Sequence, residues 1–358
     1  MKLSVNYLKP GMVLKTPVYN NRGRLLLNAG RVLTESYIEA LKRMGVLAVS
    51  IKGVDDLDME EANRVLDYEV KVEALTSIQT FVEQNMSKKN YKLLVKSVKN
   101  IVTEILSGKV PAGGLAEISA YDSYTYAHSV DVCALSIAIG YHMGLTRPTL
   151  VKLGMGALLH DLGKTRVPIE ILNKPGKLTD EEFEEIKKHP AYGYKMACYE
   201  FEEKLEPEAA LIILNHHERY DGSGYPRGLK GDELSILDMI CGIADMYNAM
   251  TTDRVYRKAL PYSEAYEMLL GSAGTYFSIE VVQAFAQCVE PYPVGTLVEM
   301  SDGRRACVIS TDTPIPTRPV IRILDTREII DLSVNLSLVI ANQLSQEEAS
   351  KLVFKSGA

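Results

Sequence analysis

The sequence lacks paired cysteines and long apolar runs, and each absence excludes a class of protein. Its five cysteines are odd in number and scattered along the chain, so we predict no disulfide framework and a reducing, cytoplasmic environment. No run of about eighteen consecutive apolar residues occurs, which excludes a helical membrane span. The first residues also lack the apolar stretch of a secretory signal, so we expect no export.

The chain also has little excess charge of either sign. Its 40 Lys and Arg residues and 46 Asp and Glu residues give a net charge of −6. This balance disfavours nucleic acid as a partner, and a phosphate-bearing ligand would need basic residues or metal ions placed locally. The apolar fraction of 46% and the charged fraction of 24% are typical of globular proteins, which excludes a wholly disordered chain.

We predict a mainly α protein in which a helical domain is flanked by two small modules. Apolar residues at helical spacing indicate the helical parts, and turn signals separate short apolar runs at both ends of the chain. The predicted parts are a small mixed α/β module at 1–53, a helical linker at 54–114, a helical domain at 115–292, a small β module at 293–345 and a tail at 346–358.

Cap and turn signals predict the elements within these parts. In the first module, a helix runs from Thr34 to Met44, and strands are expected at 13–18, 25–27 and 46–51. This module contains no histidine, and we expect a sensory, adaptor or packing role. In the helical domain, Thr179–Glu182 forms a capping box whose helix should end at His189–Pro190. The last module should hold strands at 295–300, 305–310, 320–324 and 329–332, with a frayed tail after Gln343.

All six histidines lie in the helical domain, and five of them accompany carboxylates or helix ends. Imidazole and carboxylate groups bind borderline divalent metals, and one aspartate can bridge two ions. Helices packed side by side can bring their ends to one mouth of a bundle, where metal sites recur. We leave out His142, which has no polar companion. The candidate ligands are His128, His160, Asp161, His189, His216, His217 and Asp245.

Taken alone, His189 and Asp245 differ in how strongly each indicates a metal ligand. His189, before a proline, is by itself more typical of a surface or capping residue. Asp245 is a stronger candidate because it lies between Ala244 and Met246 on an apolar helix face, where an unpaired carboxylate costs free energy.

Three motifs resemble a known enzyme family. The string from His160 to Lys164 resembles the HD metal-dependent phosphohydrolase motif. The segments 216–229 and 244–258 resemble signatures of the HD-GYP family, and the likeness spans about residues 115 to 290. The segments 8–12 and 25–33 resemble an N-terminal module often attached to this family. The resemblance implies a helical HD-type bundle.

The resemblance also implies a reaction and a ligand set. The family hydrolyses cyclic di-GMP to pGpG, and onward cleavage to GMP is left open. One ion would be held by His128, His160, Asp161 and Asp245, and Asp161 would bridge to a second ion held by His189, His216 and His217. The family implies iron or manganese, while the ligand types alone also permit zinc, cobalt or nickel. Attack by metal-activated hydroxide would expel the ribose oxygen.

Basic and aromatic residues complete the site that the resemblance implies. Lys164, Arg254 and Arg257 would contact the substrate phosphates, and Tyr225 lies in the loop beside the site. This Gly-Tyr-Pro loop is linked in the family to contact with GGDEF-domain proteins, although an exposed loop without a partner would look the same.

Two positions depart from the family pattern. Tyr124 stands where some members carry a glutamate ligand for a third metal, and a phenol is a poor ligand at neutral pH. We therefore predict two metals, and the departure puts the second cleavage in doubt. Asn248 stands where aspartate is common, and we expect it to line its helix rather than to bind metal.

Two other functions stay open at this point. One is an HD phosphohydrolase of another nucleotide, such as cyclic GMP-AMP, ppGpp or a nucleoside monophosphate. The other is a non-catalytic receptor for a cyclic dinucleotide. The second helical stretch of the linker also offers a face on which the protein could form a homodimer, although its apolar stripe could equally pack on its own domain.

Overall fold

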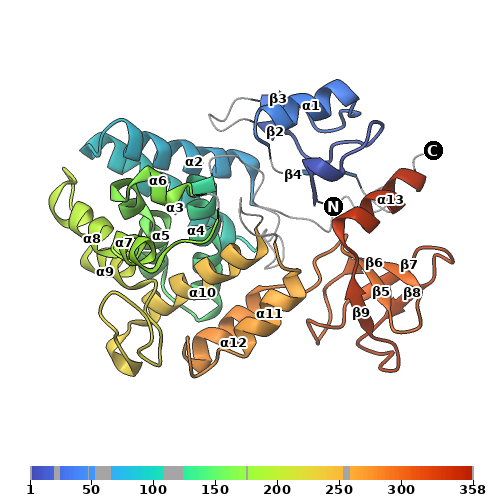
Figure 1. Ribbon diagram of the computed structural model, residues 1–358. Helices are drawn as coiled ribbons and strands as arrows, with labels where there is room; N and C mark the ends of the chain where they lie inside the picture. Colours follow the sequence, from blue (N-terminus) through green and yellow to red (C-terminus); the bar gives the residue numbers. More distant parts are fainter. Residues whose placement is uncertain are drawn as a thin grey trace.

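The computed structural model describes residues 2–19, 25–46, 48–52, 66–108, 124–174, 176–252 and 259–356. Figure 1 shows a helical body, a small N-terminal module and a C-terminal β module that carries the last helix. The mainly α fold with two small flanking modules is confirmed. No helix within the described ranges is both long and apolar enough to cross a membrane.

The N-terminal module is built from two short antiparallel strand pairs and one helix. Strand β1 (Lys2–Ser4) pairs with β4 (Ala48–Ser50), and β2 (Val18–Tyr19) pairs with β3 (Leu25–Leu27). Between them lie the 3₁₀ helix η1 (Val5–Tyr7) and helix α1 (Glu35–Arg43). The Thr34 side chain accepts a hydrogen bond from the Tyr37 N–H and caps α1, as the sequence predicted.

The strand expected at 13–18 is wrong in extent. Only Val18 belongs to a strand, because Val13 and Leu14 each form an isolated bridge to a different neighbour, at Val32 and Ile51. Val13 and Leu14 therefore contact two different segments, and the chain here does not pair continuously with either one. Strand β1 was not predicted, since three residues are too few to show a periodic pattern.

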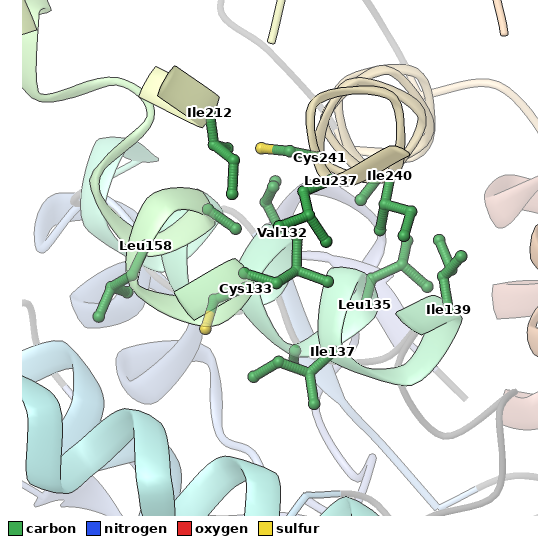
Figure 2. Close-up of a cluster of buried hydrophobic side chains, with 14 of the residues drawn as sticks. Val132, Cys133, Leu135, Ile137, Ile139, Leu158, Ile212, Leu237, Ile240 and Cys241 are labelled. Carbon is green, nitrogen blue, oxygen red and sulfur yellow. The ribbon is translucent and has the colours of Figure 1, made fainter. Parts of the chain in front are cut away.

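Helix α4 (Tyr124–His142) is the centre of the helical body. It packs against α2 (Tyr68–Glu83), α3 (Lys88–Leu106), α5 (Arg147–Leu159) and two later helices, α10 (Ile236–Thr251) and α12 (Ile279–Cys288). Residues 127–140 are buried on every side. Figure 2 shows apolar side chains of α4, α5 and α10 and the side chain of Ile212 meeting in this core. A helix that is mostly apolar on every side is expected in such a central position.

The remaining helices of the body surround this core. They include η3 (Leu162–Arg166), α6 (Ile169–Leu172), α7 (Asp180–Ile186), α8 (His189–Tyr199), α9 (Pro207–Asn215), η4 (Gly231–Glu233) and α11 (Tyr262–Leu270). The capping box of Thr179 and Glu182 is confirmed. The expected helix end at His189 is wrong, because α7 stops at Ile186 and His189 opens α8. Pro190 occupies the first turn of α8, where its missing N–H has no helical partner to lose.

The C-terminal module is one antiparallel sheet in the order β8-β7-β6-β5-β9. Its strands are β5 (Leu297–Met300), β6 (Arg305–Ser310), β7 (Val320–Ile323), β8 (Ile329–Asp331) and β9 (Ile340–Gln343). The hairpin turn at Asp302–Gly303 is confirmed, since it joins β5 to β6. Four of the strands were predicted, and β9 was missed because its residues Ala341 to Gln343 are largely polar.

The frayed tail expected after Gln343 is wrong, because helix α13 (Gln346–Ser356) occupies this segment. Ser345 and Glu348 exchange hydrogen bonds between side chain and backbone in the manner of a capping box. Ala349, on the inner face of α13, is buried against Leu297 and Cys307 of the sheet. So short a helix packs through only a few apolar residues. Its sequence therefore shows little apolar periodicity.

Helix α13 also contacts the N-terminal module (Figure 1). The Ser4 N–H donates to Oε1 of Gln346 over 2.9 Å, and the hydroxyl of Ser350 donates to the Tyr7 carbonyl over 2.7 Å. The two ends of the described chain are thereby joined.

Candidate metal centre

All seven candidate ligands converge on one place in the helical body, although they come from different elements. His128 lies in α4 and Asp245 in α10. The other five lie at helix ends: His160 follows α5, Asp161 precedes η3, His189 opens α8, and His216 and His217 follow α9. Three groups of these residues place their ligand atoms within 4.8 Å of one another. The groups are His128, His160 and Asp245; His160, Asp161 and His216; and His189, His216 and His217.

Backbone carbonyls orient three of the histidines. Nδ1 of His160 lies 2.7 Å from the Ala157 carbonyl oxygen, and His189 and His216 make the same contact with the carbonyl three residues earlier, over 2.7 and 2.9 Å. A carbonyl oxygen only accepts hydrogen bonds, so each Nδ1 carries the proton. In the neutral form of each ring, Nε2 therefore presents a bare lone pair to the centre, which is the form that binds metal.

The Asn248 side chain orients a fourth histidine, His128, in the same way. Its side-chain oxygen lies 2.7 Å from Nδ1 of His128, which leaves Nε2 of His128 to face Oδ1 of Asp245 at 3.0 Å. We expected Asn248 to line its helix, and its role as the partner of His128 was missed. The spacing of three residues from Asp245 was the available signal, because it places both side chains on one face of α10.

Asp161 lies between two histidine groups. Its Oδ1 is 3.4 Å from Nε2 of His189, and its Oδ2 is 3.4 Å from Nε2 of His160. Oδ2 also accepts from Nζ of Lys164 over 2.6 Å. The two oxygens thus face different imidazoles, as a bridging carboxylate requires.

The donor atoms are arranged as if around a cation, because their direct contacts with one another are unfavourable. Nε2 of His189 and Nε2 of His216 lie only 3.2 Å apart, and with both protons on Nδ1 the two lone pairs repel. Nε2 of His160 and Oδ1 of Asp161 are buried and make no hydrogen bond among the described residues. Buried polar atoms normally have partners, so this donor set is one that divalent metal ions would satisfy.

The carboxylates are ionised in this setting. Burial opposes ionisation of Asp161, but the charges of Lys164 and His160 outweigh it and hold the pKa well below the usual range. Burial likewise opposes ionisation of Asp245, and its contact with His128 holds the pKa of that carboxyl well below the usual range.

The pKa values of the imidazoles are shifted in different directions. Burial, reinforced by the neighbouring histidines, lowers the pKa of His216 well below its ordinary value. Burial lowers the pKa of His217 to about 3. Burial also acts to lower the pKa of His160, but Asp161 and Asp245 overcome it and the pKa is raised. At neutral pH His216 and His217 are therefore in the neutral form that metals require.

Tyr225 and Lys164, the predicted substrate contacts within the described ranges, lie beside this centre. The Tyr225 ring stacks on the His217 ring with centroids 4.8 Å apart and planes at 30°. Burial, with the nearby charges of Asp245 and Asp161, raises the pKa of the Tyr225 phenol. The Lys164 side chain is 30% exposed, so its ammonium group is accessible. Arg254 and Arg257 lie outside the described residues.

Both the helical body and the C-terminal sheet resemble known protein families. The HD domain model matches residues 103–281, and a KOW domain associated with HD domains matches residues 297–352. A cyclic di-GMP phosphodiesterase of Pseudomonas aeruginosa, PA4108, is 41% identical over 198 residues, which are 54% of this chain and 46% of that protein. A cyclic di-GMP phosphodiesterase of Thermotoga maritima is 41% identical over 164 residues, 46% of this chain and 44% of that protein.

A third relative acts on a different cyclic dinucleotide. The 3′3′-cGAMP-specific phosphodiesterase 3 of Vibrio cholerae is 33% identical over 178 residues, 49% of this chain and 38% of that protein. The chain spans about half the length of the curated relatives it matches.

One solved structure resembles most of the chain. Bd1817, an HDG"Y"P protein from Bdellovibrio bacteriovorus, superposes with a TM-score of 0.52 at 20% identity. The match covers 80% of this chain and 98% of Bd1817. At this identity the likeness speaks for the fold alone. Because the HD domain model matches half of the 358 residues, the chain belongs to the HD domain family, close to the HD-GYP cyclic di-GMP phosphodiesterases.

Proposed function

We propose that the protein is a metal-dependent phosphodiesterase that hydrolyses cyclic di-GMP to pGpG. The observation that carries this proposal is the clustering of imidazole and carboxylate ligand atoms within 4.8 Å of one another in three groups, with Asp161 between His160 and His189. The names of the relatives from Pseudomonas aeruginosa and Thermotoga maritima support the choice of substrate.

The proposed ligands divide into two sets that share Asp161. His128, His160, Asp161 and Asp245 would hold one divalent ion, and Asp161, His189, His216 and His217 would hold the second. The contacts of 3.0 Å between His128 and Asp245 and 3.2 Å between His189 and His216 support this division. Iron or manganese is the proposed metal. Tyr124, the first residue of α4, supplies no carboxylate for a third ion, so we propose two metals and pGpG as the product.

Bound divalent ions supply a lowered pKa for water and polarised phosphoryl oxygens. The protein's own residues then orient and neutralise the substrate. Hydrolysis joins a water oxygen to phosphorus and breaks the bond from phosphorus to the ribose oxygen. The accessible ammonium group of Lys164 offsets negative charge as it grows on the phosphoryl oxygens. By resemblance Arg254 and Arg257 would add to this effect.

Turnover of cyclic di-GMP by iron- and manganese-loaded protein tests the proposal. We expect the wild type to form pGpG and the variants Asp161→Ala and Asp161→Asn to form none, since neither amide nor methyl replaces a bridging carboxylate. The variant His142→Ala is the matched control, because His142 is exposed at the end of α4, and it should retain full activity. Turnover by Asp161→Ala would overturn the assignment.

The relative from Vibrio cholerae favours 3′3′-cGAMP as a second candidate substrate. Both dinucleotides should be supplied at equal concentration to the same metal-loaded protein. We expect faster loss of cyclic di-GMP, and faster loss of cGAMP would replace the proposed substrate. Only trace metal after anaerobic purification, together with no turnover of either dinucleotide, would favour a non-catalytic receptor.

A further inference from the structure

The residue after His217 is a buried carboxylate that the proposed ligand set does not use. This residue, Glu218, is only 3% exposed. One of its oxygens accepts the Arg227 N–H over 2.6 Å, and the other accepts the Leu229 N–H over 3.0 Å. A carboxylate makes stronger hydrogen bonds to N–H groups than a neutral acceptor does. Glu218 thus binds the backbone of a loop nine to eleven positions further along the chain.

This loop, residues 221–231 and called the GYP loop below, lies directly on the chain around Glu218. A Cβ atom at Gly224 would be 2.4 Å from Cα of Glu218, so only glycine permits this approach. The next N–H, that of Tyr225, donates to the His217 carbonyl over 3.2 Å. The Tyr225 ring then stacks on His217. The position of Tyr225 therefore depends on how the loop is held.

The same loop is tied to two helices that carry proposed ligands. The guanidinium group of Arg227 donates to Oδ1 of Asn215 over 2.9 Å, and the amide of Asn215 donates to Asp238 over 2.9 Å. Asn215 is the last residue of α9 and precedes His216, while Asp238 lies in the first turn of α10. Arg227 is thus held at both its backbone and its side chain.

We propose that Glu218 is a positioning residue, whose carboxylate clamps the GYP loop so that Tyr225 stays stacked on His217 beside the metal centre. The inference rests on the proposed function, because Tyr225 is placed there to contact the substrate. Because both Glu218 oxygens accept N–H groups of the loop, we assign the residue no direct contact with substrate or metal. Its charge matters because the one carboxylate accepts hydrogen bonds from both the Arg227 N–H and the Leu229 N–H.

The variant Glu218→Gln tests the clamp without changing side-chain volume. A glutamine offers one acceptor oxygen and turns its NH₂ group toward the second backbone N–H, so one hydrogen bond is replaced by a repulsion. The matched control is Glu233→Gln, since exposed Glu233 accepts the Lys230 N–H over 2.9 Å near the same loop. Hydrogen–deuterium exchange of segment 224–231 in the metal-free protein is the measurement.

We expect exchange at Arg227 and Leu229 to rise about tenfold or more in Glu218→Gln. It should stay within about twofold of wild type in Glu233→Gln, because the mutated contact there holds a different amide. Unchanged protection in Glu218→Gln would overturn the clamp. If that variant does not fold by circular dichroism, Glu218→Asp, which keeps the charge but is too short to reach both amides, replaces it.

A double-mutant cycle tests whether Glu218 acts through Tyr225. In the wild-type background we expect Glu218→Gln to raise KM about tenfold, which corresponds to about 1.4 kcal/mol, with kcat and metal content little changed. In a Tyr225→Ala background the same substitution should leave KM unchanged. An equal rise in both backgrounds would overturn the role of Tyr225. If wild type shows no turnover, the proposed function fails, while the exchange experiment still tests the clamp.

Discussion

Hydrogen bonds to Nδ1 decide what the histidines of the centre can do. Three of the acceptors are carbonyl oxygens of the preceding helical turn, and the fourth is the Asn248 amide. The sequence predicted the ligand residues because imidazole and carboxylate groups recur in recognisable motifs. It could not predict the carbonyl partners, since every residue has a carbonyl and only the fold selects which ones meet a ring.

The contact between Asn248 and His128 leads to the first prediction. Asn248→Leu removes the acceptor for the Nδ1 proton, so His128 loses its orientation, and we expect metal affinity to fall about 10- to 100-fold. Asn248→Asp retains an acceptor and should bind metal at least as well as wild type. Competition with a chelator of known affinity measures both variants. Unchanged affinity in Asn248→Leu would show that His128 is oriented by other contacts.

A pH dependence of stability follows from the imidazole pKa values. His216 and His217 have lowered pKa values in the folded protein, so below about pH 6.5 the unfolded chain binds protons that the folded one does not. Folded stability therefore falls as the pH falls. The raised pKa of His160 changes the stability only above about pH 6.5, because below that pH the ring is protonated in both the folded and the unfolded chain.

We therefore expect metal-free protein to lose about 2–3 kcal/mol of unfolding free energy per pH unit between about pH 6 and pH 5, because both imidazoles are protonated only in the unfolded chain. Urea unfolding in the presence of a chelator measures this slope. His217→Asn removes one of the two groups responsible and should reduce the slope by about half. A stability that rises as the pH falls through this window would contradict the assignment.

At the scale of elements, close backbone contacts place one helix end against another. A Cβ atom at Gly163 in η3 would lie 1.9 Å from the His189 carbonyl oxygen and 2.5 Å from the Gly193 nitrogen. The turn that follows Asp161 therefore touches the first turn of α8, which begins at His189. Only a glycine allows Asp161 and His189 to come within 3.4 Å of each other in this way.

Gly163→Ala should consequently damage both stability and the centre. We expect a loss of about 2–4 kcal/mol in unfolding free energy, because the contacting atoms are backbone and cannot move aside, together with reduced metal content. Thermal unfolding and metal analysis measure the two effects. Gly271→Ala is the control, since a Cβ atom there would meet only ordinary contacts at 3.5 and 3.6 Å. Equal stability of the two variants would refute the steric argument.

Most element types were predictable, because caps, prolines and apolar spacing are local signals. The helix from Thr34 and the capping box at Thr179 are examples. The errors occurred where tertiary contacts decide the structure. Pro190 could either follow one helix or begin another, and the packing of α8 against η3 and α9 settles the second outcome. Helix α13 depends on one buried face against the sheet, which short sequence windows do not show.

At the scale of the whole molecule, α13 joins the sheet to the N-terminal module. Ala349→Glu would place a charge between α13 and Leu297, and we expect α13 to leave the sheet. Backbone exchange at residues 2–8 should then increase, while metal content of the helical body stays unchanged. Lys351→Gln is the control, because Lys351 is exposed on the same helix. Unchanged exchange at residues 2–8 would show that the module is held by other contacts.

The bond between Ser350 and Tyr7 spans 343 positions of sequence. During synthesis, at about 5–20 residues per second, the partner of Tyr7 is translated only some twenty to seventy seconds after Tyr7 itself. The first segment of the chain must therefore leave the ribosome and wait, with one surface uncovered, while the entire helical body is made. Its attachment to α13 can form only after that body has been made.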